Sequence, residues 1–528
     1  MNALSRTQVV LKPAVASKGG VVAAQNRLAA AVGAEILENG GDAVDAAVAT
    51  SFALGVLEPW MSGPAGGGAM VIWRAEEAKA YSVFYGMRSP AGIDPADYPL
   101  SASGTASDLF PWKSVVGDRN VEGATSIAVP GTINGIGTAH KHFGRMSWRE
   151  LLQPAAIHAR RGFQIDWYAA LIIASATRSL AKDPDAAALF LEDGQWPPVP
   201  PWTALDDRRV QNARMADTIC YLAEEGFREF YEGEIAKHLA ADVQAKGGSL
   251  SFDDLRTYHA EMRQAALVPY RDGGFYVAPD LTAGPTFADV FHHLTRSIAS
   301  PCAEPESQAY CAYADAIDSA YRARLAEAGD REAPHRPACT THFSVVDRHG
   351  NMVAKTQTLL SVFGSRVVSP STGLLLNNGI MWFDPEPGHP NSLAPAKRCL
   401  MNVCPVIGET GEARFAIGAS GGRKILPAVA QLSSFLIDYR MSLEEAFHQP
   451  RIDVSGGPAV IGDEMLAPKI IEALSERRRV VTTKRTVYPN AFACPTGVMR
   501  KGGINYGASE IMSPWADAVA ESFPRGVA

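Results

Sequence analysis

Hydrophobic and polar positions alternate most clearly between residues 340 and 358. Residues 340–347 alternate between two faces, and residues 351–358 form a second segment rich in Val and Thr. A period of two predicts strands. The intervening residues 348–350 end in a glycine, which suits the position of positive φ in a three-residue hairpin loop. A hairpin centred on His349 sets Thr340 opposite Thr358, so two hydroxyls are expected to face each other.

Other segments carry the helical period. Residues 25–39 place apolar side chains four apart and stop at a glycine pair, which predicts a helix. Asp42 predicts an N-cap for a second helix at 43–57, which is apolar on nearly every side and therefore expected to be buried. The remaining predictions are a strand at 69–73, helices at 148–161, 312–329 and 443–448, a mostly helical middle at 164–270, and a β-rich stretch after the hairpin. Such blocks favour packed sheets covered by helices.

Composition narrows the class of protein. Of the 528 residues, 47% are hydrophobic and 20% charged, which is typical of a soluble globular chain that forms one interwoven body or several domains. A net charge of −7 argues against nucleic-acid binding. Seven cysteines without a CxxC pair indicate a reducing compartment. With no signal peptide or membrane-spanning run expected, we predict a cytoplasmic protein with no membrane partner.

Thr340 is the first candidate for chemistry. The charged, proline-bearing stretch 330–338 before it is expected to be an exposed, cleavable loop. Cutting the chain between Cys339 and Thr340 would free a threonine whose own α-amine can serve as the base, as in N-terminal-nucleophile enzymes. The scattered histidines lack metal-ligand spacing such as HExxH, so no metal site is predicted.

Two glycine-rich segments offer weaker signals. Residues 418–422 match the G-x-S-x-G pattern around Ser420, but the only later histidine is His448, ten positions after Asp438, which is cramped for a triad. The N–H groups of Gly421 and Gly422 could instead stabilise an oxyanion, with a tight turn as the alternative. Residues 66–68 lack the dinucleotide-binding spacing, so close backbone packing is predicted there.

The motifs taken together resemble the γ-glutamyltransferase (γ-glutamyltranspeptidase) family over nearly the whole chain. The matching segments are residues 41–48, 57–59, 66–68, 129–131, 153–155, 340–347, 373–378, 395–398 and 421–422. The resemblance implies an α/β (α+β) protein with the four-layer αββα sandwich of the N-terminal-nucleophile hydrolases.

The resemblance also implies a proenzyme that cleaves itself between Cys339 and Thr340. The products would be a large subunit, 1–339, interwoven with a small catalytic subunit, 340–528, and a dimer of such heterodimers is the assembly considered. Thr340 would be the nucleophile, Thr358 its hydroxyl partner, and Gly421 and Gly422 the oxyanion hole. No cofactor is implied.

The chain departs from the family where γ-glutamyl substrates are held. Members acting on those substrates grip the glutamyl α-carboxylate and α-ammonium with charged and polar groups. The corresponding positions here are Gly86 with Arg88 two residues later, Leu360, Trp382 with Asp384 two residues later, Met401 and Asn402. The lid segment, 385–394, is short. Losing a buried carboxylate partner of an ammonium would greatly weaken binding of a glutamyl group.

These departures predict a rebuilt substrate pocket. We expect an amide hydrolase acting on a small amide carboxylate such as oxamate, with a substrate-binding set of Arg88, Arg366, Asn378, Trp382 and Asn402. Arg398 and Lys424 are further cations for one carboxylate. Three alternatives stay open at this point: ordinary γ-glutamyl transfer or glutathione hydrolysis, a binding relative that never matures, and a hydrolase that uses Ser420.

Overall fold

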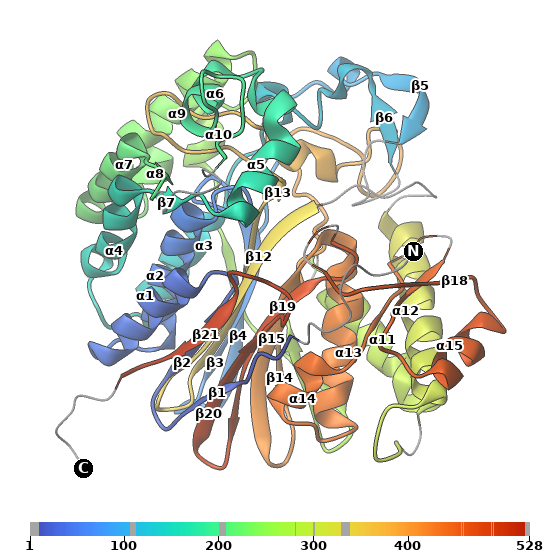
Figure 1. The fold of residues 1–528 in the computed structure, drawn as a ribbon. Helices are drawn as coiled ribbons and strands as arrows, with labels where there is room; N and C mark the ends of the chain where they lie inside the picture. Colours follow the sequence, from blue (N-terminus) through green and yellow to red (C-terminus); the bar gives the residue numbers. More distant parts are fainter. Residues whose placement is uncertain are drawn as a thin grey trace.

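Two seven-stranded sheets lie face to face in the middle of the molecule, with helices outside each (Figure 1). The computed structural model describes residues 10–105, 112–199, 207–279, 281–298, 301–328, 338–455, 457, 459–486, 488 and 490–522. The four layers run helix, sheet, sheet, helix, so the αββα sandwich that the family resemblance implies is confirmed.

The first sheet holds the predicted hairpin at its centre, and all its strands are antiparallel. Its order is β21 (Asp517–Ala520), β2 (Val21–Ala24), β12 (Ala338–Val346), β13 (Met352–Ser361), β3 (Gly67–Arg74), β4 (Lys79–Tyr85) and β9 (Glu261–Gln264). The register pairs Thr341 with Gln357 and Val346 with Met352, as the count about His349 requires. Gly350 has φ +87°, which explains the glycine in the loop.

The second sheet packs against the first and is also antiparallel. Its order is β1 (Val15–Ser17), β20 (Ile504–Ser509), β19 (Cys494–Lys501), β15 (Ala413–Ser420), β14 (Val406–Glu409), β11 (Gly273–Val277) and β10 (Leu267–Tyr270). Smaller sheets join β5 (Leu100–Thr105) with β6 (Lys113–Val115), β7 (Phe163–Gln164) with β8 (Arg209–Val210), and β16 (Ile452–Asp453) with β17 (Val460–Asp463) and β18 (Val480–Thr483).

Helices cover the outer face of each sheet. On the side of the first sheet lie α1 (Arg27–Glu38), α2 (Ala43–Leu57), α3 (Thr132–Phe143), α4 (Trp148–Arg161), α5 (Trp167–Leu180), α6 (Pro184–Phe190), α7 (Ala213–Glu225), α8 (Glu229–Glu232), α9 (Glu234–Ala245) and α10 (Phe252–Arg256). On the other side lie α11 (Gly284–Ser297), α12 (Ser307–Ala328), α13 (Ile425–Ile437), α14 (Leu443–His448) and α15 (Pro468–Ser475). Helix α2 has the predicted bounds, because Asp42 accepts hydrogen bonds from the first-turn N–H groups, and all its residues are buried.

Both faces of the central hairpin are buried. Phe343 and Val345 pack in the cluster under the helices, whereas Met352 packs in the cluster between the sheets. The polar side of the strand is also inside: His342 hydrogen-bonds to Thr356 Oγ1 at 2.9 Å. Burial, with a contribution from Lys355, lowers the pKa of His342 to about 3, so the imidazole is neutral.

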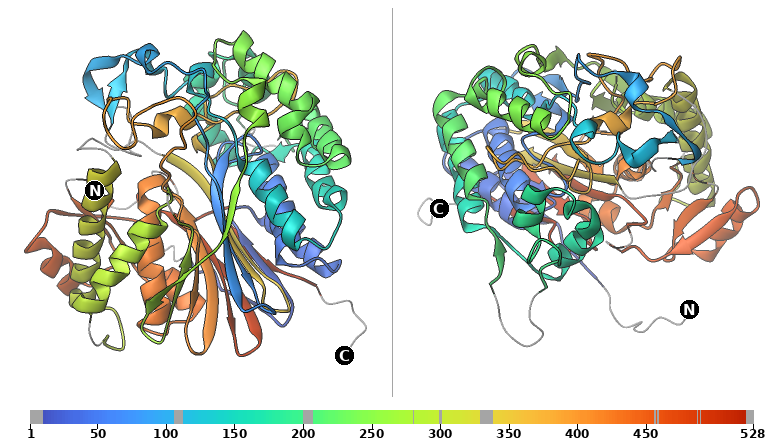
Figure 2. Two further views of the ribbon diagram at one scale, coloured as in Figure 1. Left: turned by 180° about the vertical axis from the view of Figure 1, so that it is seen from behind. Right: turned by 90° about the horizontal axis from the view of Figure 1, so that it is seen from above.

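The stretch between β13 and β14 differs from the β-rich segment predicted after the hairpin. Among these described residues the regular elements are the short 3₁₀ turn η4 (Gly379–Trp382) and isolated bridges. The chain turns repeatedly, with positive φ at Phe363, Arg366 and Ala396, and its prolines lack the N–H that a central strand needs. This segment crosses the upper end of the sandwich (Figure 2).

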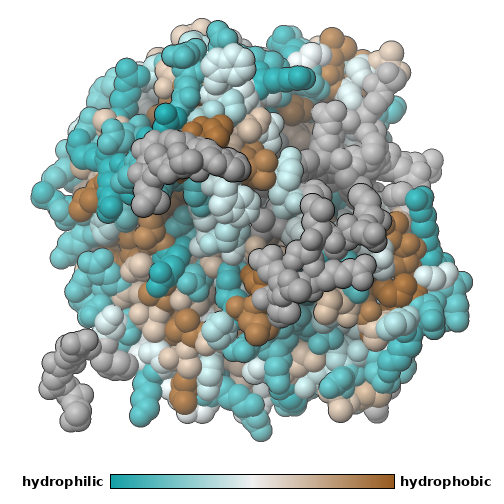
Figure 3. Space-filling view, in the orientation of Figure 1, coloured by the Kyte–Doolittle hydropathy of each residue, from teal (hydrophilic) through white to brown (hydrophobic). Residues whose placement is uncertain are grey.

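The outer surface is mixed in character. The face shown in Figure 3 is mostly hydrophilic, with small apolar areas interspersed. No helix in the described ranges combines the length and apolarity needed to cross a bilayer. The proposed cleavable loop, 330–338, lies outside the described residues except for Ala338, which begins β12.

Candidate active site

Thr340 and Thr358 meet at the upper end of the central hairpin. Thr340 Oγ1 lies 3.5 Å from Thr358 Oγ1, and both residues are buried. A register shift between Cys339 and Thr341, of the kind that a β-bulge produces, interrupts the ladder at Thr340. Bulges redirect side chains and are common beside active sites. The facing hydroxyls expected from the register are therefore present, on a locally irregular strand.

A hydrogen bond from a backbone N–H two residues later holds the Thr358 hydroxyl in place. Leu360 N donates to Thr358 Oγ1 at 2.8 Å, and Leu360 has φ +92°, a strained value for a residue with a side chain. Thr358 pairs with Gly67, and a Cβ added to Gly66 would lie 2.3 Å from Thr358 O. The close packing predicted for the glycines at 66–68 is confirmed, and it holds strand β3 against the threonine.

A buried polar network lies on the helix side of the same strand. Gln357 Nε2 donates to Ser62 Oγ at 2.9 Å, and Ser51 Oγ donates to Gln357 Oε1 at 2.5 Å. Lys355 Nζ bonds to both Ser51 Oγ and Gln357 Oε1, and burial lowers the pKa of Lys355 well below its usual value. The network ties α2 and the loop after it to the strand that carries Thr358.

Gly421 and Gly422 form a tight turn after β15. Their φ values are +134° and +60°, conformations that residues with side chains rarely adopt. A Cβ added to Gly421 would lie 3.0 Å from Ala493 Cα. The turn continues as η5 (Gly422–Lys424), which lies against β12, the strand that bears Thr340.

Among the described residues, Ser420 has no histidine partner that would make it a nucleophile. Its Oγ accepts from Gln25 Nε2 at 2.6 Å, and the same nitrogen donates to Cys494 O at 2.9 Å. His448 bonds instead to Glu444 O and to Lys12 N. The geometry of a Ser–His pair is absent here, so the serine-hydrolase alternative has no structural support.

An apolar wall, which we define as Leu360, Trp382 and Met401, lies where γ-glutamyl enzymes carry polar groups. All three residues are at most 2% exposed and belong to one hydrophobic cluster. Trp382 O accepts from Trp112 Nε1 at 3.3 Å and from Asn391 Nδ2 at 2.6 Å. The three replacements are therefore buried apolar residues of the same hydrophobic cluster.

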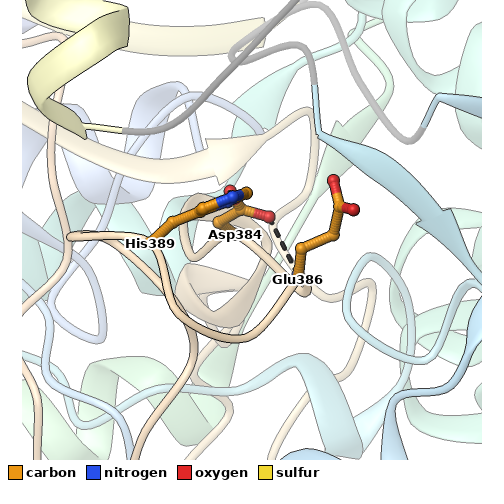
Figure 4. A group of neighbouring side chains, drawn as sticks. All are labelled: Asp384, Glu386 and His389. Carbon is orange, nitrogen blue, oxygen red and sulfur yellow. Dashed lines mark hydrogen bonds and ion pairs between the residues drawn. The ribbon is translucent and has the colours of Figure 1, made fainter.

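The loop after this wall carries a compact group of ligand-type side chains, Asp384, Glu386 and His389 (Figure 4). Their ligand atoms lie within 4.8 Å of one another, so the group could hold a metal ion. Asp384 already accepts from His389 Nδ1 at 2.6 Å and from Glu386 N at 2.9 Å, and Glu386 pairs with Lys113. These bonds brace the loop beside Trp382.

Two predicted substrate cations are engaged with protein groups. Arg88 Nη2 donates to Asp254 O and to Thr257 Oγ1, each at 2.8 Å. Arg398 donates to backbone carbonyls and pairs with Glu261 at 3.3 Å. The hydrogen bonds of both arginines therefore join the segment between α10 and β9 to the chain around residue 86.

The other predicted binding residues are similarly placed. Arg366 Nη1 donates to Val121 O at 3.0 Å, and Lys424 Nζ donates to a backbone carbonyl. Asn378 Nδ2 donates to Val121 O and to Ser361 Oγ, each at 2.9 Å, so its amide shapes the loop. Asn402 is buried beside the apolar wall.

Sequence reasoning passed over Arg423, which directly follows the glycine pair. It is 7% exposed, and its guanidinium donates no hydrogen bond to any described residue. The guanidinium carbon lies 6.0 Å from the centre of the Tyr321 ring, and Tyr321 Oη donates to Arg423 O. The sequence signal that could have identified Arg423 is its position. It is a charged residue directly after the glycine pair, just before the wholly buried helix α13.

The fold defines the class. The structure aligns with the crystal structure of cephalosporin acylase from Bacillus halodurans over 99% of each chain, with a TM-score of 0.83 and 22% identity, a likeness that concerns the fold. The αββα sandwich is that of the N-terminal-nucleophile hydrolases.

Sequence comparison gives the family. The gamma-glutamyltranspeptidase model matches residues 29–339 and 332–519, so the chain belongs to that family and is an amidohydrolase or acyltransferase. The Acylase ACY 1 proenzyme of Pseudomonas sp. (strain V22) is 33% identical over 513 residues, 90% of this chain and 89% of that protein. The glutathione hydrolase proenzyme of Bacillus subtilis (strain 168) is 29% identical over 489 residues, 82% of this chain and 80% of that protein.

Proposed function

We propose that the chain is a self-cleaving proenzyme whose mature form hydrolyses amides with Thr340 as the nucleophile. The observation that carries this proposal is the pair of buried hydroxyls, Thr340 Oγ1 and Thr358 Oγ1, 3.5 Å apart at the end of the central hairpin. Membership in a family of proenzymes supports it.

Maturation begins at the Cys339–Thr340 peptide. Thr340 Oγ attacks the Cys339 carbonyl carbon and the C–N bond breaks, which gives an ester and a free α-amine. Water then hydrolyses the ester. The large subunit, 1–339, gains a carboxylate, and the small subunit, 340–528, begins with Thr340.

Turnover repeats the attack on a substrate amide. Thr340 Oγ adds to the carbonyl carbon while its proton passes to the α-amine, whose ordinary pKa of about 7.7–8.0 suits a general base near neutrality. The N–H groups of Gly421 and Gly422 stabilise the oxyanion. The leaving nitrogen takes the proton and departs, and water hydrolyses the acyl-threonine. The Thr358 hydroxyl, 3.5 Å from Thr340 Oγ1, orients the nucleophile.

We propose a small amide carboxylate, oxamate-like in chemistry, as the substrate. The apolar wall of Leu360, Trp382 and Met401 supports this choice, because it gives a glutamyl α-ammonium no buried carboxylate to pair with. The second candidate is γ-glutamyl hydrolysis or transfer, which the similarity to the Bacillus subtilis glutathione hydrolase proenzyme favours.

One experiment separates these possibilities. The purified protein is weighed by intact-mass spectrometry and then assayed for ammonia release from oxamate, succinamate and glutaramate, beside a chromogenic γ-glutamyl anilide. We expect two chains and ammonia from an amide carboxylate. Rapid anilide turnover with no ammonia would favour the second candidate, and a single uncut, inactive chain would contradict both.

A further inference from the structure

Arg423 is a buried cation without a counter-ion in the described part of the chain. It is 7% exposed, and its guanidinium has neither an ion pair nor a hydrogen bond there. Burying an unpaired charge is costly, so arginines inside proteins are normally matched by carboxylates or carbonyls. The five N–H donors of such a guanidinium are therefore available to a ligand that accepts hydrogen bonds.

A second buried arginine, Arg324 from α12, lies in the same region. Its Nη1 donates to Thr282 O at 2.8 Å and its Nη2 to Met401 O at 2.8 Å, whereas its Nε has no partner. No described carboxylate pairs with it, and burial lowers the pKa of Arg324 to about 10. Arg324 Nη1 also donates to Thr286 Oγ1 at 3.2 Å, so carbonyl and hydroxyl dipoles surround the positive charge at this place.

Tyr321 connects the two arginines. Burial raises the pKa of Tyr321, and the charges of Arg423 and then Arg324 oppose that rise, which places both guanidiniums near one hydroxyl. Asp453 and Cys404 also act on this tyrosine. Asp453 accepts from Ser455 Oγ at 2.8 Å.

The cationic pair adjoins the proposed reaction centre on two sides. Arg423 follows Gly422 in the turn that lies against β12. Arg324 holds the carbonyl of Met401, which belongs to the apolar wall. A substrate carbonyl seated at the turn, with its acyl group along that wall, would extend toward this positive charge.

We propose that Arg423, with Arg324 behind it, binds a carboxylate on the acyl side of the substrate. The proposal rests on the proposed function and deepens it, since it assigns the substrate class, an amide that also carries a carboxylate, to one residue. The guanidinium fork matches a carboxylate in a bidentate manner, which a carboxamide of the same size does not reproduce.

The kinetic test compares substrate pairs that differ only in this group: oxamate with oxamide, succinamate with succinamide, and glutaramate with glutaramide. In wild type we expect higher kcat/KM for the carboxylate of at least one pair. Arg423→Gln should lower the carboxylate-to-carboxamide ratio about 10- to 100-fold, the range typical of a hydrogen bond to a charged group. Arg423→Lys should lower the ratio less, because it keeps the charge and loses the fork.

The control is Arg322→Gln, which changes an exposed arginine that pairs with Asp318 on α12, the helix of Arg324. It should leave the ratio unchanged. Denaturing gels establish that each variant is cut into two chains, and if Arg423→Gln fails to mature, Arg423→Lys carries the comparison. A ratio equal to that of wild type in the Arg423 variants would overturn the inference.

A binding measurement decides the inference even if no amide is turned over, an outcome that counts against the proposed function itself. Oxalate, succinate and glutarate are added to the mature protein, and the melting temperature is recorded. At least one should stabilise wild type and Arg322→Gln, because a ligand that binds only the folded state raises its stability, and it should not stabilise Arg423→Gln. Equal stabilisation of both proteins, or none in wild type, would overturn the carboxylate site.

Discussion

Glu58 is a buried acidic residue that has no ion pair with any described residue. It follows α2, is 3% exposed, and its Oε2 has no hydrogen-bond partner among the described residues. Burial raises the pKa of Glu58 to about 8. The loop that begins there packs on the strand of Thr358, since Leu359 N donates to Met61 O at 3.3 Å. Glu58 therefore links the ionisation of one carboxyl to the stability of the proposed site.

The sign of the effect follows from proton linkage. The folded chain keeps the Glu58 proton to a higher pH than the unfolded chain, so the stabilisation is complete below the ordinary pKa of 4.5 and is lost as the pH rises through about 8. The full change is worth about 5 kcal/mol, and about 3.5 kcal/mol of it falls between pH 5 and pH 8.

The assay is urea unfolding at pH 5, 6.5 and 8 for wild type and Glu58→Gln. Glutamine is neutral throughout, so the free energy of unfolding of the variant should exceed that of wild type by an amount that grows by about 3.5 kcal/mol over this range. Parallel pH profiles for the two proteins would refute the reasoning.

Glu510→Gln is a control because the pKa of this buried carboxyl is shifted in the opposite direction to that of Glu58. Burial alone would raise the pKa of Glu510, but Arg451 and Arg485 outweigh it and hold the pKa below its usual value. Its charge is therefore already present at pH 5. Removing the partner of the buried Arg451 should lower stability by about 3–5 kcal/mol, with little change between pH 5 and pH 8.

Three further predictions concern the reaction. Thr358→Val removes the hydroxyl that orients Thr340, so it should slow cleavage in a gel time course and lower kcat at least about tenfold; unchanged rates would exclude this role. Ser420→Ala loses only the hydrogen bond from Gln25 and should cost about 1 kcal/mol in urea unfolding while kcat stays within about twofold; loss of activity would revive the serine alternative. Trp382→Asp restores a carboxylate to the apolar wall and should raise kcat/KM for a γ-glutamyl anilide relative to oxamate; a constant ratio would show that Trp382 does not select the acyl group.

Local rules were sufficient for the elements nearest the site. Asp42 and the apolar residues after it were enough to predict the bounds of α2. Both the N-cap and the burial of the helix depend on residues that are close together in the sequence. The glycine of the hairpin loop set the register that brings Thr340 to Thr358. The register shift at Thr340 was not predictable, since it depends on the strands packed on either side.

The structural features that could not be predicted depend on contacts between residues far apart in the sequence. The segment after β13 has the composition of many turns, but its course over the sandwich is set by contacts with distant parts, such as the bond from Asn377 Nδ2 to Ala65 O. Arg88 and Arg398 donate to the carbonyls of distant segments, which their positions in the sequence do not indicate. Arg423 is distinguished by its 7% exposure and by a guanidinium without a described hydrogen bond or ion pair, and Glu58 by a buried Oε2 without a described partner, and both features depend on the fold.

The most direct test of the central claim is the intact mass of wild type beside Thr340→Ala, with Thr341→Ala as the neighbouring hydroxyl control. We predict that wild type and Thr341→Ala separate into chains 1–339 and 340–528 and release ammonia from an amide carboxylate. Thr340→Ala should remain one inactive chain. Scission at the same bond together with undiminished turnover in Thr340→Ala would contradict the account.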